Sequence, residues 1–444
     1  MRIKLIAPSV KMKMSLHSSR VFKIRRLCLP LLAALTPPDH TTQIVDEDFA
    51  PDDLDENVDL VGITVMTEHA LRAYQIAEFY RGCGAKVVLG GVQPTLLPEE
   101  ALKYADSIVI GEAEEVWPKL VSDAASGQLQ KVYRAAKPPQ LKGLPLPRRD
   151  LYPNLIYKSD TPLATGIETS RGCPYDCEFC SVSRLTGRHL RCRPIHEIIA
   201  EIESLGSTVP LLFVDENLGL NREMFKDLLS QLIPLRRIWL GQGSFSLAED
   251  KELIKLMHRS GCRGLLIGFE SVQSKVQEGM KKSENRKIDY PEAIHRFHGE
   301  GIPIFGAFIL GFDHENKDIF NRTYEFVMKN YLDYASIRLL TPYPGTRIYN
   351  RLLKEKRLFV NDWWLHEYST ETLLFQPKNM TPSELVDGFF SLHKQFSSVG
   401  KIFKRFFGIP PWKRTITGCL AYAALNLDQR KCFLKRVNTP QPFV

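Results

Sequence analysis

Three cysteines in one short segment are the residues whose types and spacing point most directly to chemistry. Cys173, Cys177 and Cys180 lie within eight residues of the chain, and this spacing lets their thiolates surround one face of a cubane iron–sulfur cluster. A cubane has four irons, so three cysteines leave one iron open. An open position is typical of a catalytic site, by the reasoning that separates catalytic from structural zinc sites. We therefore expect a 4Fe–4S cluster bound by this segment.

Two other metal sites match part of the pattern. One is a zinc ion that lacks its fourth ligand, and the other is a four-cysteine cluster completed by Cys192. Zinc is disfavoured because the cysteines follow a predicted strand in a strand–helix alternation, with no ribbon or knuckle signature around them. Cys192 could also be a substrate-facing thiol or a small buried hydrophobe. Tyr343, between Pro342 and Pro344, could face a substrate or shape a turn.

The composition is that of an ordinary globular protein. The chain has 444 residues, 44% hydrophobic and 25% charged, with a net charge of +8, and its length allows two or three domains. Nine cysteines are too few for a disulfide scaffold and indicate a reducing compartment. The apolar run near the N-terminus is too short for a signal peptide, and no run of about 18 apolar residues exists. We expect a cytoplasmic protein.

The elements that must position the cysteines begin with an alternation of strands and helices over residues 1–136. The expected strands are 3–7, 43–45, 60–65, 86–89 and 107–110, with helices at 29–35 and 72–80. This order, with glycines at strand ends, predicts a doubly wound, Rossmann-like parallel sheet. Ligands bind beyond the carboxyl ends of such strands. The residues at those ends are Thr64, Thr67, Gly90, Gly91 and Gly111, although the glycines could also serve only to make tight turns.

A linker rich in proline and basic residues follows at 137–158, where we expect no regular structure. The segment 159–355 alternates again, with expected strands at 164–169, 211–214, 238–242, 264–267, 304–309 and 336–340 and helices at 195–204 and 252–258. Six strand–helix units predict a partial (β/α)6 barrel with its chemistry at the C-terminal strand ends.

The remaining segment, 356–444, predicts a helical extension rich in basic and aromatic residues. Between Lys401 and Arg436 there are nine Lys or Arg and one acidic residue, Asp428, interleaved with aromatic residues such as Phe403 and Trp412. This pattern is typical of a surface that lies on a membrane or meets a lipid-like substrate. The alternatives are a helix packed on the barrel with a solvated basic face, and contact with nucleic acid, which we disfavour.

The cysteine segment resembles the radical S-adenosylmethionine (SAM) superfamily, whose CxxxCxxC motif it matches, with Phe179 at the usual aromatic position. The resemblance implies that SAM chelates the open iron and is cleaved to a 5′-deoxyadenosyl radical. It also implies SAM contacts at the end of the second barrel strand and in the segment 264–270, which resembles the family's fifth strand near the adenine. The SAM-binding residues implied are Phe179, Asp215, Glu216, Asn217, Gly268 and Glu270.

The N-terminal part resembles the cobalamin-binding domain of one radical SAM subgroup, the class B methyltransferases, through segments 59–64, 87–94 and 109–114. Segments 311–314 and 341–346 resemble the same subgroup. The chain has no DxHxxG motif, so no histidine replaces the lower axial ligand of cobalt, and Gln93 stands where relatives commonly carry His. The cobalamin-binding residues implied are Thr64, Thr67, Gly90, Gly91, Gln93, Gly111 and Glu112.

The resemblance implies C-methylation of an unactivated carbon in a hydrophobic small molecule, with a 4Fe–4S cluster, SAM and cobalamin as cofactors. Such a carbon has no lone pair with which to attack an electrophilic methyl group, so a radical must first remove hydrogen, and two stacked domains can place both cofactors against one substrate. Radical cyclisation, ring contraction or oxidation without methyl transfer is the alternative, and a non-catalytic cobalamin or cluster sensor is the second. The partner implied by the resemblance is an electron donor such as flavodoxin or ferredoxin. The basic and aromatic residues of 401–436 separately predict contact with the inner membrane face.

Overall fold

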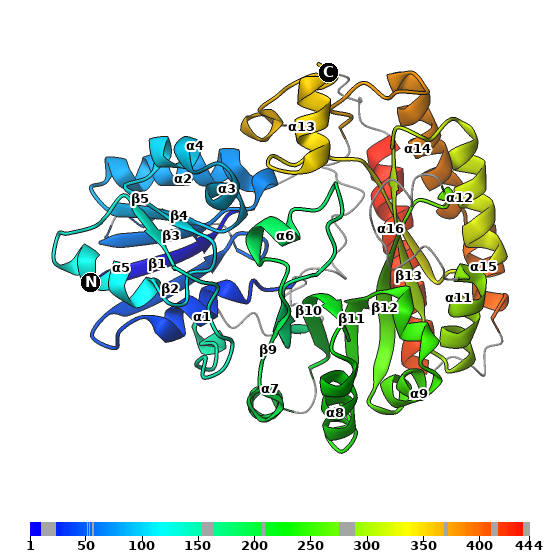
Figure 1. The fold of residues 1–444 in the computed structure, drawn as a ribbon, viewed down its shortest axis with the longest axis horizontal. Helices are drawn as coiled ribbons and strands as arrows, with labels where there is room; N and C mark the ends of the chain where they lie inside the picture. The colour runs from blue at the N-terminus through cyan, green and yellow to red at the C-terminus, as the bar shows by residue number, and fades with distance from the viewer. Residues whose placement is uncertain are drawn as a thin grey trace.

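The computed structural model describes residues 1–9, 24–50, 52, 54–55, 57–152, 164–206, 209–274, 289–367, 372–409 and 416–437. Figure 1 shows two α/β units, one blue to cyan and one green to yellow, with the C-terminal helices against the second. Both units contain a six-stranded parallel sheet. This confirms the predicted order of a doubly wound unit, a second strand–helix unit and a helical extension.

The first sheet has the strand order β2-β1-β3-β4-β5-β6. Every neighbouring pair is parallel, and the direction of winding reverses between β1 and β3, which places the topological switch point there. The sequence did not lead us to expect β6, the shortest of these strands. Their bounds are β1 (Arg2–Ala7), β2 (Thr41–Asp46), β3 (Leu60–Thr64), β4 (Lys86–Gly90), β5 (Ser107–Ile110) and β6 (Val132–Arg134).

Helices cover both faces of this sheet because its strands are apolar on both sides. On one face Leu5 and Val109 pack against α1 (Cys28–Leu35) and α5 (Trp117–Ala125). On the other, Ile63 and Leu89 pack against a second group of helices. That group consists of η2 (Thr67–His69), α2 (Ala70–Gly82), α3 (Val92–Leu96) and α4 (Pro98–Tyr104).

The linker is more ordered than the sequence predicts. Arg149–Leu151 form a short 3-10 helix, η3, so the expectation of no regular structure across 137–158 is wrong over these residues. The side chains of Leu141 and Tyr152 are buried, and Arg149 pairs with Glu201 of the second unit at 2.5 Å. Burial of apolar side chains and this ion pair hold the linker against the protein. Residues 153–158 lie outside the described residues.

The second sheet has the order β14-β13-β12-β11-β10-β7, and all of its neighbouring strands are parallel. Within the described residues, β14 and β7 are not paired with each other, so the sheet forms the predicted partial barrel. The bounds are β7 (Thr165–Ile167), β10 (Leu211–Leu218), β11 (Trp239–Gly243), β12 (Cys262–Glu270), β13 (Ile304–Leu310) and β14 (Tyr334–Leu339). β12 is the fourth strand of this sheet, as the predicted strand order has it, although its segment 264–270 resembles the family's fifth strand.

Helices on the outer side of this sheet enclose the largest apolar core, in which Trp239, Phe269 and Phe308 are fully buried. The helices between its strands are α7 (Ile195–Ser204), α8 (Arg222–Leu232), η4 (Phe245–Glu249), α9 (Lys251–Arg259), α11 (Tyr290–Gly299) and α12 (Asp318–Lys329). A two-stranded antiparallel ribbon, β8 (Ser170–Arg171) with β9 (Arg191–Cys192), follows β7. Residues 172–190, including α6 (Val182–Leu185), connect the two strands of the ribbon, and we call them the cluster loop.

The C-terminal segment contacts both units. Its elements are α13 (Arg347–Lys354), η6 (Trp363–Leu365), α14 (Pro382–Phe396), α15 (Val399–Phe407) and α16 (Ile416–Val437). Trp363 and Trp364 are buried in the apolar core of the first unit, and the Trp364 indole donates to Glu100 at 3.0 Å. Among the described residues, no helix combines the length and apolar composition needed to cross a bilayer.

Side chains of α14 and α16 form hydrogen bonds with backbone carbonyls along the outer edge of β14, which has no neighbouring strand among the described residues. Asn426 Nδ2 donates to the Asp333 carbonyl at 3.0 Å, and Gln429 Nε2 donates to the Ala335 carbonyl at 2.9 Å. His393 Nε2 lies 3.2 Å from the Ile337 carbonyl. Since unpaired edge carbonyls would otherwise be buried without partners, these side chains replace a seventh strand.

Candidate functional site

The cluster loop carries Cys173, Cys177 and Cys180, all of them half-buried and none in a disulfide. Gly172 begins the loop with φ +98°, and a Cβ there would lie 2.3 Å from the His189 carbonyl oxygen. Only glycine fits at this point, where the two ends of the loop approach each other. The loop therefore presents three thiols from one short, closed segment, and this set of donors fits a cubane cluster.

Within the described residues, no group of three or more His, Cys, Asp or Glu side chains surrounds a point where a single metal ion could bind. A cubane cluster does not need such convergence, since each of the three thiolates binds a different iron. Cys192 lies on β9 opposite Ser170, and burial raises the pKa of its thiol, which makes it a weaker metal ligand.

Asp215 and Glu216, at the carboxyl end of β10, hold the cluster loop in place. Asp215 is buried, and its carboxylate accepts hydrogen bonds from the Thr169 hydroxyl at 2.6 Å and the Ser170 hydroxyl at 2.6 Å. Burial raises the pKa of Asp215, and these hydrogen bonds oppose the shift. Glu216 accepts from the Gly172 amide at 3.3 Å and the Thr186 hydroxyl at 2.9 Å. Two of the three predicted SAM-binding carboxylates thus already bind the protein's own chain, Asp215 just before the cluster loop and Glu216 within it.

The other predicted SAM-binding residues lie on β10, on β12 and in the cluster loop. Asn217 is buried, and its Oδ1 has no hydrogen-bond partner within the described residues, which makes it an acceptor that a ligand could use. Gly268 and Glu270 lie at the carboxyl end of β12, where the pairing with β13 shifts register. Glu270 has φ +61°. Phe179 packs edge-on against Phe312, with ring centroids 6.0 Å apart.

The loop that contains Phe312 follows β13 and is fixed by a buried carboxylate. Glu315 is fully buried and accepts hydrogen bonds from the Gly311 amide at 2.7 Å, the Phe312 amide at 3.1 Å and the Ser271 hydroxyl at 2.6 Å. Burial raises the pKa of Glu315 to about 7, and the hydrogen bonds limit that rise. This carboxylate joins the ends of β12 and β13 beside the cluster loop.

A cavity of about 280 Å³ lies beyond the carboxyl ends of β3, β4 and β5. Five of the predicted cobalamin-binding residues line it, namely Thr64, Gly90, Gly91, Gly111 and Glu112. Gly91 has φ +93°, and a Cβ there would lie 3.0 Å from Thr64 Oγ1, so the chain can pass here only without a side chain. Apolar residues of α1 and α5 form the floor, and Glu168, Arg171, Thr186 and Val214 close the side facing the barrel. The glycines leave room at the strand ends and the floor is apolar, so the cavity can accept part of a large ligand such as cobalamin.

The other two predicted cobalamin-binding residues, Thr67 and Gln93, do not line this cavity. Both are fully buried, and Gln93 Nε2 donates to Glu100 at 2.9 Å within the layer of α2 and α4. Each side chain also retains an oxygen without a partner within the described residues. They follow the strand ends in sequence, but their helices direct the side chains into the interior.

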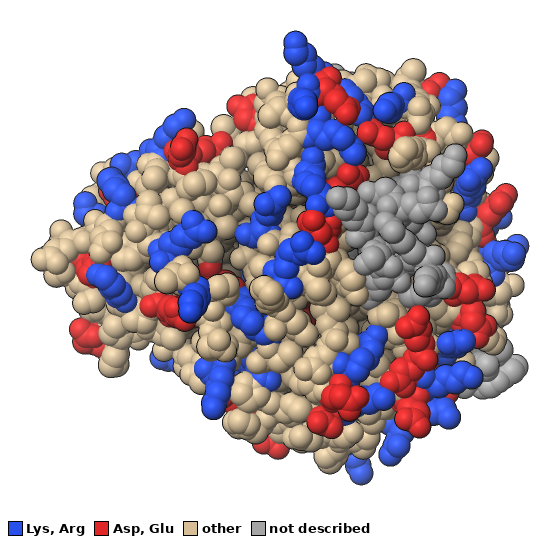
Figure 2. All heavy atoms as spheres, viewed as in Figure 1, with Lys and Arg blue, Asp and Glu red and all other residues tan. Residues whose placement is uncertain are grey.

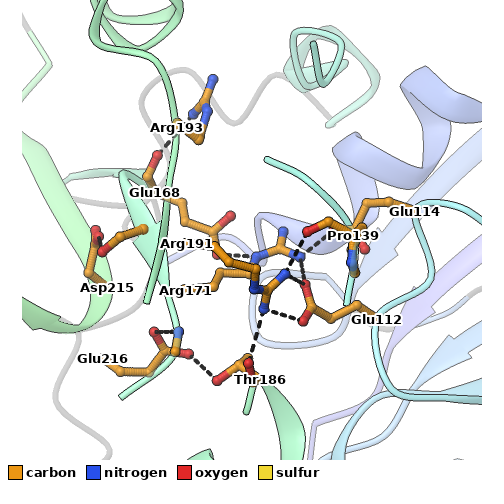
Figure 3. A network of polar contacts seen from close by, with 12 residues as sticks. Glu112, Glu114, Pro139, Glu168, Arg171, Thr186, Arg191, Arg193, Asp215 and Glu216 are labelled. Carbon is orange, nitrogen blue, oxygen red and sulfur yellow. Dashed lines mark hydrogen bonds and ion pairs between the residues drawn. The ribbon is translucent and has the colours of Figure 1, made fainter. Parts of the chain in front are cut away.

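An ion-pair network joins the cavity to the cluster loop (Figure 3). Arg171, two residues before Cys173, pairs with Glu112 at 2.6 Å, Glu114 at 2.6 Å and Glu168 at 2.8 Å. Arg191, at the far end of the loop, pairs with the same Glu112 at 2.5 Å. Burial raises the pKa of Glu168, and the charge of Arg171 opposes that rise. Glu112 therefore fastens one unit to the other, a contact that no local pattern of residues predicts.

Further contacts join the two units. The Tyr343 hydroxyl, for which we considered both a substrate-facing and a turn role, donates to Glu68 at 2.8 Å across the units. Burial is the main reason that the pKa of Tyr343 lies well above its ordinary value, and the charge of Glu68 adds to the effect.

Helix α13 also contacts the cluster loop. Its Arg347 binds Asp176 of that loop, and Arg351 binds Glu178 at 3.0 Å. The cluster loop is thus held from several directions at once.

Comparisons with known proteins agree with this architecture. The Radical SAM superfamily pattern matches residues 167–327, and the B12 binding domain pattern matches residues 33–121. Bacteriochlorophyllide d C-12(1)-methyltransferase of Chlorobaculum tepidum is 31% identical over 414 residues, which are 91% of this chain and 89% of that protein. Bacteriochlorophyllide d C-8(2)-methyltransferase of the same organism is 31% identical over 354 residues, 76% of this chain and 78% of that protein.

Among solved structures, the chain is similar to the radical S-adenosylmethionine methyltransferase TsrM from Kitasatospora setae with cobalamin and a [4Fe-4S] cluster bound. The TM-score is 0.71 at 16% identity, over 98% of this chain and all of that one. At this level of identity the likeness concerns the fold. The arrangement of a B12-binding unit followed by a radical SAM unit is therefore shared with that structure.

Proposed function

We propose that this chain, which belongs to the cobalamin-dependent radical SAM methyltransferases, methylates an unactivated carbon of a tetrapyrrole. The observation that carries the proposal is the position of Arg171, which lines the cavity at the B12-binding unit and lies two residues from Cys173. The two cofactor sites therefore share a wall. When bound, the cluster and SAM supply a 5′-deoxyadenosyl radical, and cobalamin supplies the methyl group.

The role of the chain's own residues is to hold and orient the cofactors, which carry the reactive groups. Cys173, Cys177 and Cys180 would hold the cluster, with Asp215 and Glu216 fixing the loop that presents them. Thr64, Gly90, Gly91 and Gly111 would hold part of cobalamin at the cavity. Asn217 on β10, with its free buried acceptor, is our candidate for a direct SAM contact, together with Phe179 of the cluster loop and Gly268 and Glu270 of β12. This arrangement places two cofactors against one substrate, which lowers the entropic cost of the reaction.

A tetrapyrrole is the substrate class that we favour because the two bacteriochlorophyllide d methyltransferases match most of this chain. The test is anaerobic incubation of the reconstituted enzyme with SAM, a reductant and bacteriochlorophyllide d. We expect a singly methylated product, together with 5′-deoxyadenosine and S-adenosylhomocysteine. Formation of both nucleosides without a methylated tetrapyrrole would show that the substrate class is wrong.

Radical chemistry without methyl transfer is a second candidate. The chain is 26% identical, over 75% of its length and 58% of that protein, to the anaerobic magnesium-protoporphyrin IX monomethyl ester cyclase of Cereibacter sphaeroides. The two functions differ in one product, since only methyl transfer converts SAM to S-adenosylhomocysteine. Release of 5′-deoxyadenosine alone, with a modified tetrapyrrole, would favour the cyclase-like reaction.

The enzyme also needs an electron donor, for which we propose a small carrier protein such as flavodoxin or ferredoxin. We further propose a peripheral contact of α15 and α16 with the inner face of the cytoplasmic membrane, where a hydrophobic substrate would accumulate. Exposed apolar side chains recur on both helices: Phe403 and Phe407 are 55% and 63% exposed on α15. On α16, Leu420, Leu427 and Leu434 are exposed at every seventh position.

The basic residues of this region contribute unevenly. Lys404 and Lys431 are exposed, but Arg405 is fully buried and bonds to Asn426 at 2.8 Å. Trp412 and Lys413 lie outside the described residues. We expect the protein to sediment with vesicles containing phosphatidylglycerol, and a Phe403→Ser, Phe407→Ser variant to lose most of that binding. Phe359→Ser, which removes a phenylalanine that is 40% exposed elsewhere, is the matched control. Equal vesicle binding by all three proteins would contradict the proposal.

A further inference from the structure

The outer side of the cluster loop lies beside a surface rich in arginine and lysine. Helix α13 places Arg347, Arg351 and Lys354 on one face, since positions four and seven residues apart align on a helix. Arg347 and Arg351 reach the cluster loop through Asp176 and Glu178. The segment 347–357 contains five Lys or Arg and one acidic residue, Glu355. Asp313 also pairs with Arg351 and Arg357, and Glu355 pairs with Arg357. The exposed Lys354 and Lys356 carry no ion pair among the described residues, so they are the positive charges left over.

The cluster loop adds further positive charges to the same surface. Arg188 is 58% exposed, and its guanidinium donates to the Pro174 carbonyl at 3.1 Å, within the cysteine segment. Figure 2 shows Lys and Arg side chains following one another down the face that lies over α13 and α6 in Figure 1. We call this the basic surface. It consists of Arg184, Arg188, Arg347, Arg351, Lys354 and Lys356.

The basic surface is also the exposed side of the cluster loop. The other sides of the loop are packed: Arg171 ties it to the first unit, Glu216 to β10, and Phe179 to the loop after β13. Pro174, between the first two cysteines, is exposed. A carrier protein that approaches the exposed residues Pro174, Arg184 and Arg188 of the cluster loop would therefore meet this surface.

We propose that the basic surface docks an acidic one-electron carrier protein of the flavodoxin or ferredoxin class. This inference rests on the proposed function, because only a cluster that must be reduced needs such a partner. In the step concerned, the carrier is oxidised by one electron and the cluster is reduced by the same electron, with no proton or group transferred. Opposite charges on the two surfaces would steer the encounter and orient the carrier over the cysteine segment.

The test is the affinity of oxidised flavodoxin for the reconstituted holoenzyme, measured by biolayer interferometry at low and at physiological salt. In the test variant, Arg184→Glu with Lys354→Glu, both residues are exposed and neither carries an ion pair among those described. We expect the Kd to rise at least about tenfold, and its dependence on salt to become weaker, because two attractive charges become repulsive. The control Lys251→Glu with Lys329→Glu makes the same charge change at exposed positions of α9 and α12 and should keep the wild-type Kd.

Dithionite separates the docking surface from the chemistry, since a small reductant needs no docking site. The test variant should cleave SAM with dithionite at a rate within about twofold of wild type, but much more slowly with reduced flavodoxin. A flavodoxin Kd within twofold of wild type would overturn the inference, and so would displacement of flavodoxin by a tighter-binding single-stranded RNA. Failure of the wild type to cleave SAM with dithionite would instead refute the proposed function, and the Kd comparison would still decide the docking surface.

Discussion

Replacing Arg171 with methionine tests whether the ion-pair network holds the two units together. Arg171 is 11% exposed, and its partners Glu112, Glu114 and Glu168 are 10%, 9% and 18% exposed. Methionine keeps much of the side-chain volume but removes the charge. Arg191 still pairs with Glu112, so the loss falls on Glu114 and Glu168, which become buried carboxylates without this cation.

Removing one partner of a buried ion pair costs about 3 to 5 kcal/mol, because the remaining charge stays buried without compensation. Arg148→Met is the matched control, since Arg148 pairs with Asp150 at 2.8 Å but the two side chains are 51% and 61% exposed. A pair of that exposure contributes at most about 1 kcal/mol. We expect the free energy of unfolding to fall by about 3 to 5 kcal/mol in Arg171→Met and by less than about 1 kcal/mol in the control.

The effect should also depend on pH, in a direction that follows from Glu168. Burial already raises the pKa of Glu168 above its ordinary value, and Arg171 opposes that rise, so the variant raises it further. A carboxyl with a raised folded-state pKa binds its proton more tightly in the folded protein, so its contribution to stability declines as the pH increases. The difference between wild type and variant should therefore be smallest near pH 4.5 and grow toward pH 8.

The assay is urea unfolding of both variants and wild type at pH 5 and pH 8, followed by tryptophan fluorescence. Trp117 and Trp364 lie in the two apolar cores of the first unit and Trp239 lies in the core of the second, so the signal reports on the unfolding of both units that the network joins. A loss below 1 kcal/mol at pH 8, or a loss that does not grow between pH 5 and pH 8, would refute the argument that these carboxylates are held by Arg171.

Three further predictions concern the cofactor sites and the loop beside them. The triple variant Cys173→Ala, Cys177→Ala, Cys180→Ala should lose the roughly four irons per chain that anaerobic reconstitution gives, whereas Cys192→Ala should keep them; iron retained by the triple variant would disprove the assignment. Gly91→Ala should weaken corrinoid binding about tenfold in an absorbance titration, because Gly91 has φ +93° and an added Cβ would contact Thr64 Oγ1. Gly84→Ala is the control, since Gly84 has a similar φ of +87° but open space around it, and this variant should bind the corrinoid as wild type does. Glu315, whose folded-state pKa is raised to about 7, should make the protein roughly 3 kcal/mol less stable at pH 8 than at pH 4.5, and Glu315→Gln should remove that part of the pH dependence in urea unfolding; an unchanged slope would show that another group is responsible.

Most elements of both sheets were predictable because their sequence patterns are local. Strand β5 and helix α7 have the predicted bounds, since a short apolar run and an amphipathic period of 3.6 residues can each be read within one window. Strand β6 was missed because it has three residues and only Tyr133 is buried. The ordered linker was missed because its order comes from distant partners such as Glu201, which no local pattern reveals.

The candidate site divides in the same way. The cysteine spacing and the glycines at strand ends are local signals, and they led to the cluster loop and to the cavity. The direction in which a side chain points after a strand end depends on how the following helix packs, and a local sequence pattern does not show this. For this reason we expected Thr67 and Gln93 at the ligand site, although both side chains are buried away from the cavity. Arg171 and Glu112 are 59 residues apart, so the contact that joins the two cofactor sites could be found only from the fold.

The capping of β14 by side chains has a consequence for the order of events during synthesis. On the ribosome, β14 emerges before the amides of Asn426 and Gln429 that later bind its carbonyls. The 90 residues between Leu339 and Gln429 take roughly 5 to 18 seconds to translate. During that interval the nascent barrel exposes an unpaired strand edge, the feature by which unfinished chains pair with one another. In a truncated chain that ends after α13 this edge would stay unpaired. Such a fragment should aggregate even though it contains each strand that the structure describes and the cluster loop.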